Sequence, residues 1–115
     1  MRNIALVTGA SSGMGKEFVR EISKKYKGLD EIWVVARRRE RLRELKKEII
    51  GTRVRILPLD LMKEESFERL KMVLAKEQPV VRILVNASGY GISGQVIINN
   101  SVQRDVISYE FALIA

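Results

Sequence analysis

The 115-residue sequence contains no cysteine and no histidine. The first absence excludes disulfide bonds, thiol nucleophiles and thiolate metal ligands, and the second excludes imidazole bases and most zinc or iron sites. A hydrolytic triad therefore cannot be assembled in this chain. Catalysis by acid pairs would have to use Asp and Glu residues whose positions are typical of helix surfaces.

Long hydrophobic runs are also absent. The apolar residues 4–7 are too few for the hydrophobic region of a signal peptide, and no stretch approaches the roughly 18 apolar residues of a membrane span. We therefore expect a cytoplasmic protein without a targeting segment and without a membrane partner. A hydrophobic content of 46% is enough for one ordinary core, and we expect a single domain over residues 1–115.

The formal net charge is +7, and nearly all of the excess lies in residues 37–55. This segment holds nine basic side chains and three glutamates, Glu40, Glu44 and Glu48. Glutamates that recur every four residues among bases are typical of a solvated helix with i,i+4 ion pairs. Arg37 and Arg38 precede this helix and need a separate explanation.

Apolar runs of strand length alternate with helical periodicity along the chain, which indicates βαβ units around a parallel sheet. The pattern predicts an α/β domain with strand order 3-2-1-4, if the crossovers are right-handed. The expected strands are residues 3–7, 31–36, 54–59 and 81–85. The expected helices are residues 14–26, with Phe18, Ile22 and Tyr26 facing inward, residues 40–50, and a third helix that carries Phe67, Leu70 and Leu74 and ends before Pro79.

Beyond Gly89 the pattern loosens. Residues 96–98 follow too closely on the fourth strand for a parallel crossover, so we expect a loop or an antiparallel excursion there. A final helix is expected from about Ser101. The fourth strand would then form an apolar edge with only Arg82 charged, which predicts a homo-oligomer formed through this edge. The alternative is that residues 96–98 fold back and cover the edge within one chain.

A glycine-rich segment, residues 8–15, lies between the first strand and the first helix. Glycines at such a place allow a tight turn and let backbone N–H groups approach a pyrophosphate at the helix N-terminus. The alternative interpretation, a plain strand-to-helix turn, is weakened by this context. The expected binding residues in this loop are Gly9, Ser11, Ser12, Gly13, Met14 and Gly15.

The loop reads Thr-Gly-x-x-x-Gly-x-Gly, and in this the chain resembles the short-chain dehydrogenase/reductase family over residues 3–89. The resemblance implies a Rossmann-type fold and an oxidoreductase that uses a nicotinamide dinucleotide. It also implies that Asp60, with Leu61, binds the adenine amino group, although Asp60 could equally serve as a helix N-terminal acid. The family's Asn-Asn-Ala-Gly segment, which braces the sheet and lines the ribose, corresponds to Asn86, Ala87, Ser88 and Gly89. Ala87 departs from this pattern and removes one side-chain hydrogen bond.

The end of the second strand predicts which cofactor is preferred. A site for NAD requires an acidic residue there to bind the ribose 2′-hydroxyl, whereas a 2′-phosphate requires a nearby arginine instead. Ala36 is neutral, and Arg37 and Arg38 follow it. Because a guanidinium can bind a phosphate with two hydrogen bonds, the sequence favours NADP(H).

No catalytic residue is assigned. Family members use a Tyr-x-x-x-Lys pair and a serine, but the last lysine here is Lys76, and neither Tyr90 nor Tyr109 has a lysine four residues later. Ser101 only faintly resembles the family's catalytic serine, and Glu110 occupies the approximate place of a family asparagine. We therefore expect a truncated, inactive NADP(H)-binding half of an oxidoreductase that acts on a carbonyl or an alcohol.

Two other functions compete with this interpretation. The same loop could serve a non-enzymatic nucleotide-binding or regulatory module, and the arginine-rich segment could bind nucleic acid. The second alternative is disfavoured because no aromatic platform lies among the bases and the glutamates dilute the positive field.

Overall fold

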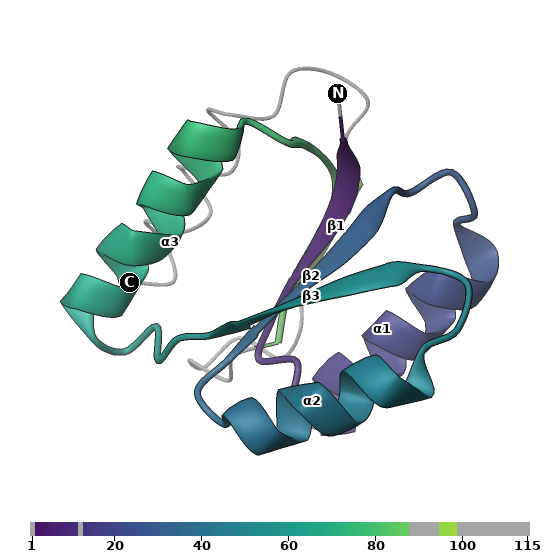
Figure 1. Ribbon diagram of the computed structural model, residues 1–115, viewed down its shortest axis with the longest axis horizontal. Helices are drawn as coiled ribbons and strands as arrows, with labels where there is room; N and C mark the ends of the chain where they lie inside the picture. The colour runs from purple at the N-terminus through teal and green to yellow at the C-terminus, as the bar shows by residue number, and fades with distance from the viewer. Residues whose placement is uncertain (1, 12, 88–94, 99–115) are drawn as a thin grey trace.

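The computed structural model describes residues 2–11, 13–87 and 95–98, the last segment by its backbone (Figure 1). Strands and helices alternate along the chain, as the apolar pattern predicts. The elements are β1 (Asn3–Thr8), α1 (Gly13–Lys25), β2 (Glu31–Ala36), α2 (Arg39–Glu48), β3 (Arg53–Pro58), α3 (Glu64–Glu77), β4 (Val80–Asn86) and β5 (Gln95–Ile98).

The strands form one sheet in the order β3-β2-β1-β4-β5. The first four of these are mutually parallel, which confirms the predicted order 3-2-1-4. Helices α1 and α2 cover one face of the sheet and α3 covers the other, as Figure 1 shows. This arrangement is a doubly wound α/β fold of the Rossmann type.

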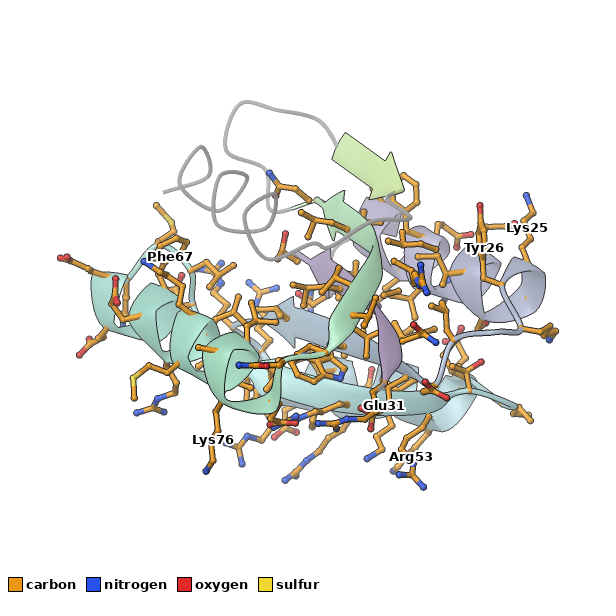
Figure 2. The ribbon with its side chains drawn as sticks, turned by 90° about the horizontal axis from the view of Figure 1, so that it is seen from above. Lys25, Tyr26, Glu31, Arg53, Phe67 and Lys76 are labelled. Atoms are coloured by element: carbon orange, nitrogen blue, oxygen red, sulfur yellow. The ribbon has the colours of Figure 1, made fainter. Side chains whose placement is uncertain are left out.

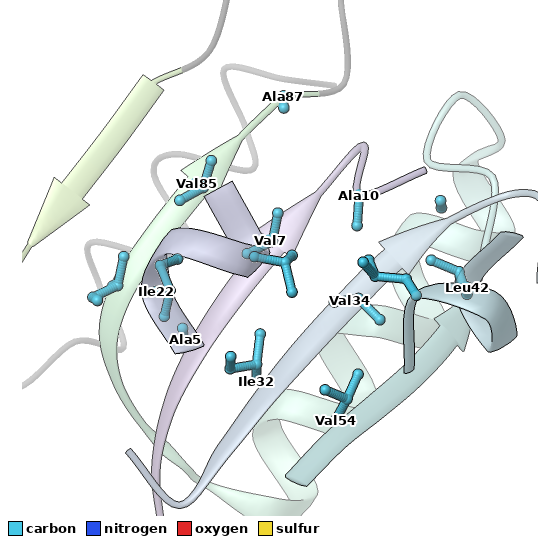
Figure 3. Close-up of a cluster of buried hydrophobic side chains, with 14 residues drawn as sticks. Ala5, Val7, Ala10, Ile22, Ile32, Val34, Leu42, Val54, Val85 and Ala87 are labelled. Atoms are coloured by element: carbon cyan, nitrogen blue, oxygen red, sulfur yellow. The ribbon is translucent and has the colours of Figure 1, made fainter. Parts of the chain in front are cut away.

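Each face of the sheet carries its own core. Val19 and Ile22 of α1 pack with Leu42 and Leu45 of α2 over the first face, where the strands contribute Ala5, Val7, Ile32, Val34 and Val85 (Figure 3). On the second face, Phe67 and Leu70 of α3 meet Ile4, Leu6, Trp33, Val35 and Leu84. Strands β1 and β2 are therefore buried on both sides, and this explains why their sequences are continuously apolar rather than alternating.

Helix α1 differs from its prediction at the C-terminal end. It stops at Lys25, and Tyr26, which was expected to face inward, is 41% exposed. Tyr26 extends from the outer end of the helix in Figure 2. The inward side of α1 is formed by Gly15, Val19, Ile22 and Ser23, with Phe18 partly buried beside them. The inward spacing predicted from the sequence was therefore correct for Ile22, partly correct for Phe18 and wrong for Tyr26.

The fourth strand is not the open edge that the sequence suggested. Residues Ile83 to Asn86 pair antiparallel with β5, from Ile98 to Gln95. The antiparallel alternative for residues 96–98 is thus confirmed, because the short connection permits a hairpin return but no parallel crossover. Because β5 covers β4, the argument for self-association through an unpaired fourth strand no longer applies. That the protein forms a homo-oligomer stays a prediction. The helix expected from Ser101 lies outside the described residues.

An ion-pair cluster ties the amino ends of the strands to α3. Glu77 accepts hydrogen bonds from Arg2 and Arg55, both at 2.6 Å, and Arg2 also contacts the buried Glu31 at 3.0 Å. The Arg55 guanidinium lies 4.6 Å from the ring centroid of Trp33, which is fully buried. The bonds from Arg55 and Arg2 lower the pKa of Glu77. A depressed carboxyl pKa stabilises the fold above the unfolded-state pKa, and this contribution disappears as the pH falls through the folded-state pKa.

We predict that Gln78→Gly stabilises the protein. Gln78 ends α3 in the left-handed region, with φ of 47°, and its N–H donates to the Leu74 carbonyl at 2.9 Å. A side chain is strained there and glycine is not, so we expect a gain of about 0.5–1 kcal/mol in the free energy of unfolding. Urea denaturation measures it. Gln78→Ala keeps the Cβ atom and should bring no gain, and equal stabilisation by both variants would contradict the explanation.

Candidate dinucleotide site

The carboxyl ends of the parallel strands are aligned along one edge of the sheet. Thr8 of β1 pairs with Val35 and with Asn86, and Ala36 pairs with Pro58 in the neighbouring strand. Every segment predicted to bind the cofactor follows directly on one of these strand ends. Parallel α/β sheets bind ligands outside this edge, so the structure brings the predicted segments to the place where a ligand is expected.

The loop between β1 and α1 is shaped by two glycines. Gly9 has a φ of 68°, which side chains rarely tolerate. Gly15 lies so close to the loop that a Cβ atom there would be 2.1 Å from the Gly9 carbonyl oxygen and 2.9 Å from the Ala10 Cα. The Ala10 N–H also donates to the Val35 carbonyl at 3.2 Å. These contacts hold the loop against both the start of α1 and the end of β2.

Gly13, in contrast, is not required by the packing of the protein. A Cβ atom added at Gly13 would have no neighbour within 4 Å, and the residue is exposed at the first position of α1. The first turn of α1 contains no acidic side chain, and Met14 beside it is 42% exposed. Helix N-termini carry partial positive charge and N–H groups with no partner inside the helix. The space beside Gly13 is therefore open to an anion.

The structure describes only one of the two predicted serines of this loop. Ser11 is half-buried within the turn, and Ser12 lies outside the described residues. Ser88 and Gly89, which follow the fourth strand, also lie outside them.

A buried polar contact joins the ends of β1 and β4. The Thr8 hydroxyl lies 3.1 Å from Asn86 Oδ1 and 3.4 Å from the Val85 carbonyl, and the Ala87 N–H donates to the Thr8 carbonyl at 3.0 Å. Thr8 is fully buried, and Asn86 and Ala87 are nearly so. Thr8 is the residue that sequence reasoning passed over, although one polar side chain at the end of an apolar strand was a usable signal.

Arg37 and Arg38 lie at the end of β2, where Ala36 is buried and both arginines are exposed. Within the part of the chain that the structure describes, neither side chain has a hydrogen-bond or ion-pair partner. Arg38 is the N-cap residue of α2, but its side chain makes no capping bond. Two guanidinium groups are thus free at the sheet edge that carries the glycine loop.

Asp60 is not at a helix N-terminus, contrary to one of the two interpretations of its role. Helix α3 begins four residues later, at Glu64. The Asp60 carboxylate instead accepts a hydrogen bond from the Met62 N–H at 3.1 Å and closes the turn that leads from β3 toward α3. Leu61 points into the core on the α3 face and is 9% exposed. Only Asp60 of this pair offers a side chain to the edge.

The prediction of ion pairs within α2 was wrong. Among the described residues no ion pair joins two α2 side chains, and Glu48 binds Arg20 of α1 instead. Intrahelical pairs occur in the other two helices, between Glu21 and Lys25 and between Glu68 and Lys71. Packing of α1 beside α2 gives Glu48 a closer guanidinium than its own helix supplies.

A comparison of the sequence with protein families decides the relationship. The sequence profile of the family described as short chain dehydrogenase matches residues 3–110. The chain belongs to the short-chain dehydrogenase family. An NADP-dependent 3-hydroxy acid dehydrogenase of Escherichia coli is 36% identical over 90 residues, which is 77% of this chain and 34% of that protein. An NAD-dependent glycerol dehydrogenase of Listeria innocua is 31% identical over 91 residues, covering 77% and 34% respectively.

Solved short-chain dehydrogenases share the fold. One from Sphingobium yanoikuyae, in complex with NADPH, superposes with a TM-score of 0.62 and 26% identity over 73% of this chain and 32% of that one. The chain spans between 25% and 34% of the length of the curated relatives it matches. The described residues hold no cluster of carboxylates able to bind a metal ion, and none of their helices is long and apolar enough to cross a membrane.

The two glycines at the start of α1, Gly13 and Gly15, should respond oppositely to replacement by alanine. Gly15→Ala forces a methyl group onto the Gly9 carbonyl oxygen and should lower the free energy of unfolding by about 1–3 kcal/mol. Gly13→Ala meets no atom and should leave stability unchanged or raise it by up to about 1 kcal/mol. Urea denaturation of both variants tests the contrast, which two equal losses would refute.

Proposed function

We propose that this chain binds NADP(H) and forms the cofactor-binding half of an oxidoreductase that interconverts a carbonyl compound and an alcohol. The proposal rests above all on the two exposed guanidinium groups of Arg37 and Arg38, which follow a neutral Ala36 at the carboxyl edge and have no partner among the described residues. When bound, the cofactor would supply the hydride or accept it. The residues described here would bind and orient it.

The pyrophosphate would lie at the start of α1. Gly15 allows the start of the helix to lie against the loop, and Gly9 turns the chain there at a positive φ. Gly13 leaves open the volume that a Cβ atom would occupy, although the fold itself does not need that volume. An acid in the first turn of α1 would repel the pyrophosphate, and that turn has none. The residues present therefore fit a bound diphosphate.

The 2′-phosphate would be held by Arg37 and Arg38. A ribose 2′-hydroxyl is normally bound by a carboxylate at the end of β2, and Ala36 offers none. The relatives divide on this point, since the Escherichia coli protein is named as NADP-dependent and the Listeria innocua protein as NAD-dependent. Family membership alone does not select the cofactor, and the choice depends on this chain's own two arginines.

The remaining part of the cofactor would extend across the sheet edge. One Asp60 carboxylate oxygen accepts the Met62 N–H, and the other would accept a hydrogen bond from the adenine amino group. The Thr8–Asn86 contact fixes the end of β4, from which the segment around Ala87 would line the nicotinamide ribose. Both roles follow the family resemblance at these positions.

Replacing Arg37 and Arg38 together by alanine should remove the preference for NADP(H). We expect binding of NADPH to weaken by about 1–3 kcal/mol because charge-assisted hydrogen bonds to the phosphate are lost, while binding of NADH stays unchanged. Isothermal titration calorimetry with each cofactor measures both. Arg53→Ala, at the other end of the sheet, serves as the control. Tighter binding of NADH than of NADPH by the unmutated chain would overturn the assignment.

The chain alone should not catalyse hydride transfer. None of the three tyrosines has a lysine four residues later, so the ammonium group with which the family lowers the pKa of its proton-donating tyrosine has no counterpart in this sequence. Purified protein should oxidise NADPH no faster than background with a panel of aldehydes and ketones, as followed by absorbance. A rate that survives Ser101→Ala would refute this expectation, and a rate abolished by that change would assign the chemistry to Ser101.

A further inference from the structure

Most basic side chains of helix α2 lie on the flank opposite its glutamates, and Arg41, which lies on the side of Glu44 and Glu48, is the exception. The buried Leu42 and Leu45 fix which side of the helix faces the sheet. Positions 40, 44 and 48 repeat every four residues along one flank, and all three carry glutamate. The other flank carries Arg39, Arg43, Lys46 and Lys47, which we call the basic flank.

The acidic flank meets positive charge of α1 at Glu48. Arg20 of α1 binds Glu48 through two nitrogens, the second of them 3.1 Å from Oε1. Hydrogen bonding to Arg20 lowers the pKa of Glu48, and the nearby charge of Lys16 contributes in the same direction. Because Glu48 faces α1, the basic flank lies on the side of α2 away from α1.

The basic flank is not neutralised by the protein. All four of its residues are exposed, and among the described residues none of them has a carboxylate partner. Two other arginines each form ion pairs with two carboxylates. Arg2 binds Glu31 and Glu77, and Arg20 binds Glu17 and Glu48. An uncompensated positive field therefore begins immediately after Arg37 and Arg38.

We propose that the basic flank of α2 steers the anionic cofactor into the site. The flank accelerates association without contacting the bound cofactor, and this inference rests on the proposed NADP(H) function. A 2′-phosphate adds about two negative charges to the dinucleotide near neutral pH. Arg39 and Arg43 lie roughly 2 and 8 Å along the helix axis from Arg38. Both distances are within the screening length of about 10 Å at 0.1 M salt, so their field reaches an approaching phosphate.

A small phosphorylated ligand fits this surface better than nucleic acid does. The flank spans only about 12 Å from Arg39 to Lys47 and ends beside the proposed 2′-phosphate position. No aromatic side chain lies on α2 to stack against a base. The basic flank is short, lies next to the site and offers no aromatic ring for base stacking. It is therefore suited to attracting a small anion toward Arg37 and Arg38.

The test is the association rate of NADPH, measured by stopped-flow fluorescence at 0.1 M salt. In the double variant Arg39→Gln and Arg43→Gln, the association rate constant should fall about three-fold or more, with an unchanged dissociation rate constant. The association rate constant of NADH should fall less, because NADH lacks the 2′-phosphate and carries less negative charge. Raising the salt to about 0.5 M should bring the variant and the unmutated chain together.

A charge-matched control separates steering from net charge. Lys24 and Lys76 are exposed near the C-terminal ends of α1 and α3, roughly 16 and 18 Å along those helices from their starts. Figure 2 shows Lys76 away from Phe67, which lies near the start of the same helix. The double variant Lys24→Gln and Lys76→Gln removes the same charge and should leave the association rate nearly unchanged.

The outcomes distinguish this proposal from the one on which it rests. If the unmutated chain does not bind NADPH, both are wrong. If NADPH binds but Arg39→Gln with Arg43→Gln leaves the association rate unaltered, only steering is wrong. A change confined to the dissociation rate would mean direct contact and would overturn steering. Equal losses in the control variant, or tighter binding of a duplex oligonucleotide than of NADPH, would also overturn it.

Discussion

The contact between Gly15 and the Gly9–Ala10 turn is the constraint from which the site follows. Helix α1 can start beside the end of β1 only because neither glycine carries a side chain, and a single methyl group at Gly15 would strike the Gly9 carbonyl oxygen. This approach sets the direction of α1, and with it the packing of Val19 and Ile22 on the sheet. The same contact places the positive end of the helix at the carboxyl edge, so that packing and anion binding use one geometry.

The aligned strand ends turn this local geometry into a site. Residues far apart in sequence meet because β1, β2, β3 and β4 are parallel and in register, with Thr8 between Val35 and Asn86. The opposite end of the sheet is occupied by the Arg2, Arg55 and Glu77 cluster around Trp33. Among the described residues, Arg2 and Arg55 are thus paired with carboxylates near the amino edge, whereas Arg37 and Arg38 have no such partner at the carboxyl edge.

Much of the architecture was predictable, and the failures have local causes. Doubly buried strands are continuously apolar, which identified β1, β2 and β4 and hence the order of the parallel strands. Tyr26 was misplaced because the helix stops one residue earlier than its apolar spacing suggested. The ion pairs expected within α2 failed because Glu48 meets Arg20 of a different helix. The covering of β4 by β5 was only one of two options, since a short apolar run near a strand edge can pair within its own chain or with another.

The sequence by itself determined the alternation of strands and helices, the glycine loop and the neutral residue followed by two arginines, because these depend on local spacing and residue type. Only the tertiary structure decided which glycine the packing needs, since Gly13 and Gly15 look alike in sequence but only Gly15 touches another backbone segment. It also revealed the contact that braces Thr8 against Asn86, and it paired Glu48 of α2 with Arg20 of α1. These depend on contacts between segments distant in sequence, which local patterns do not encode.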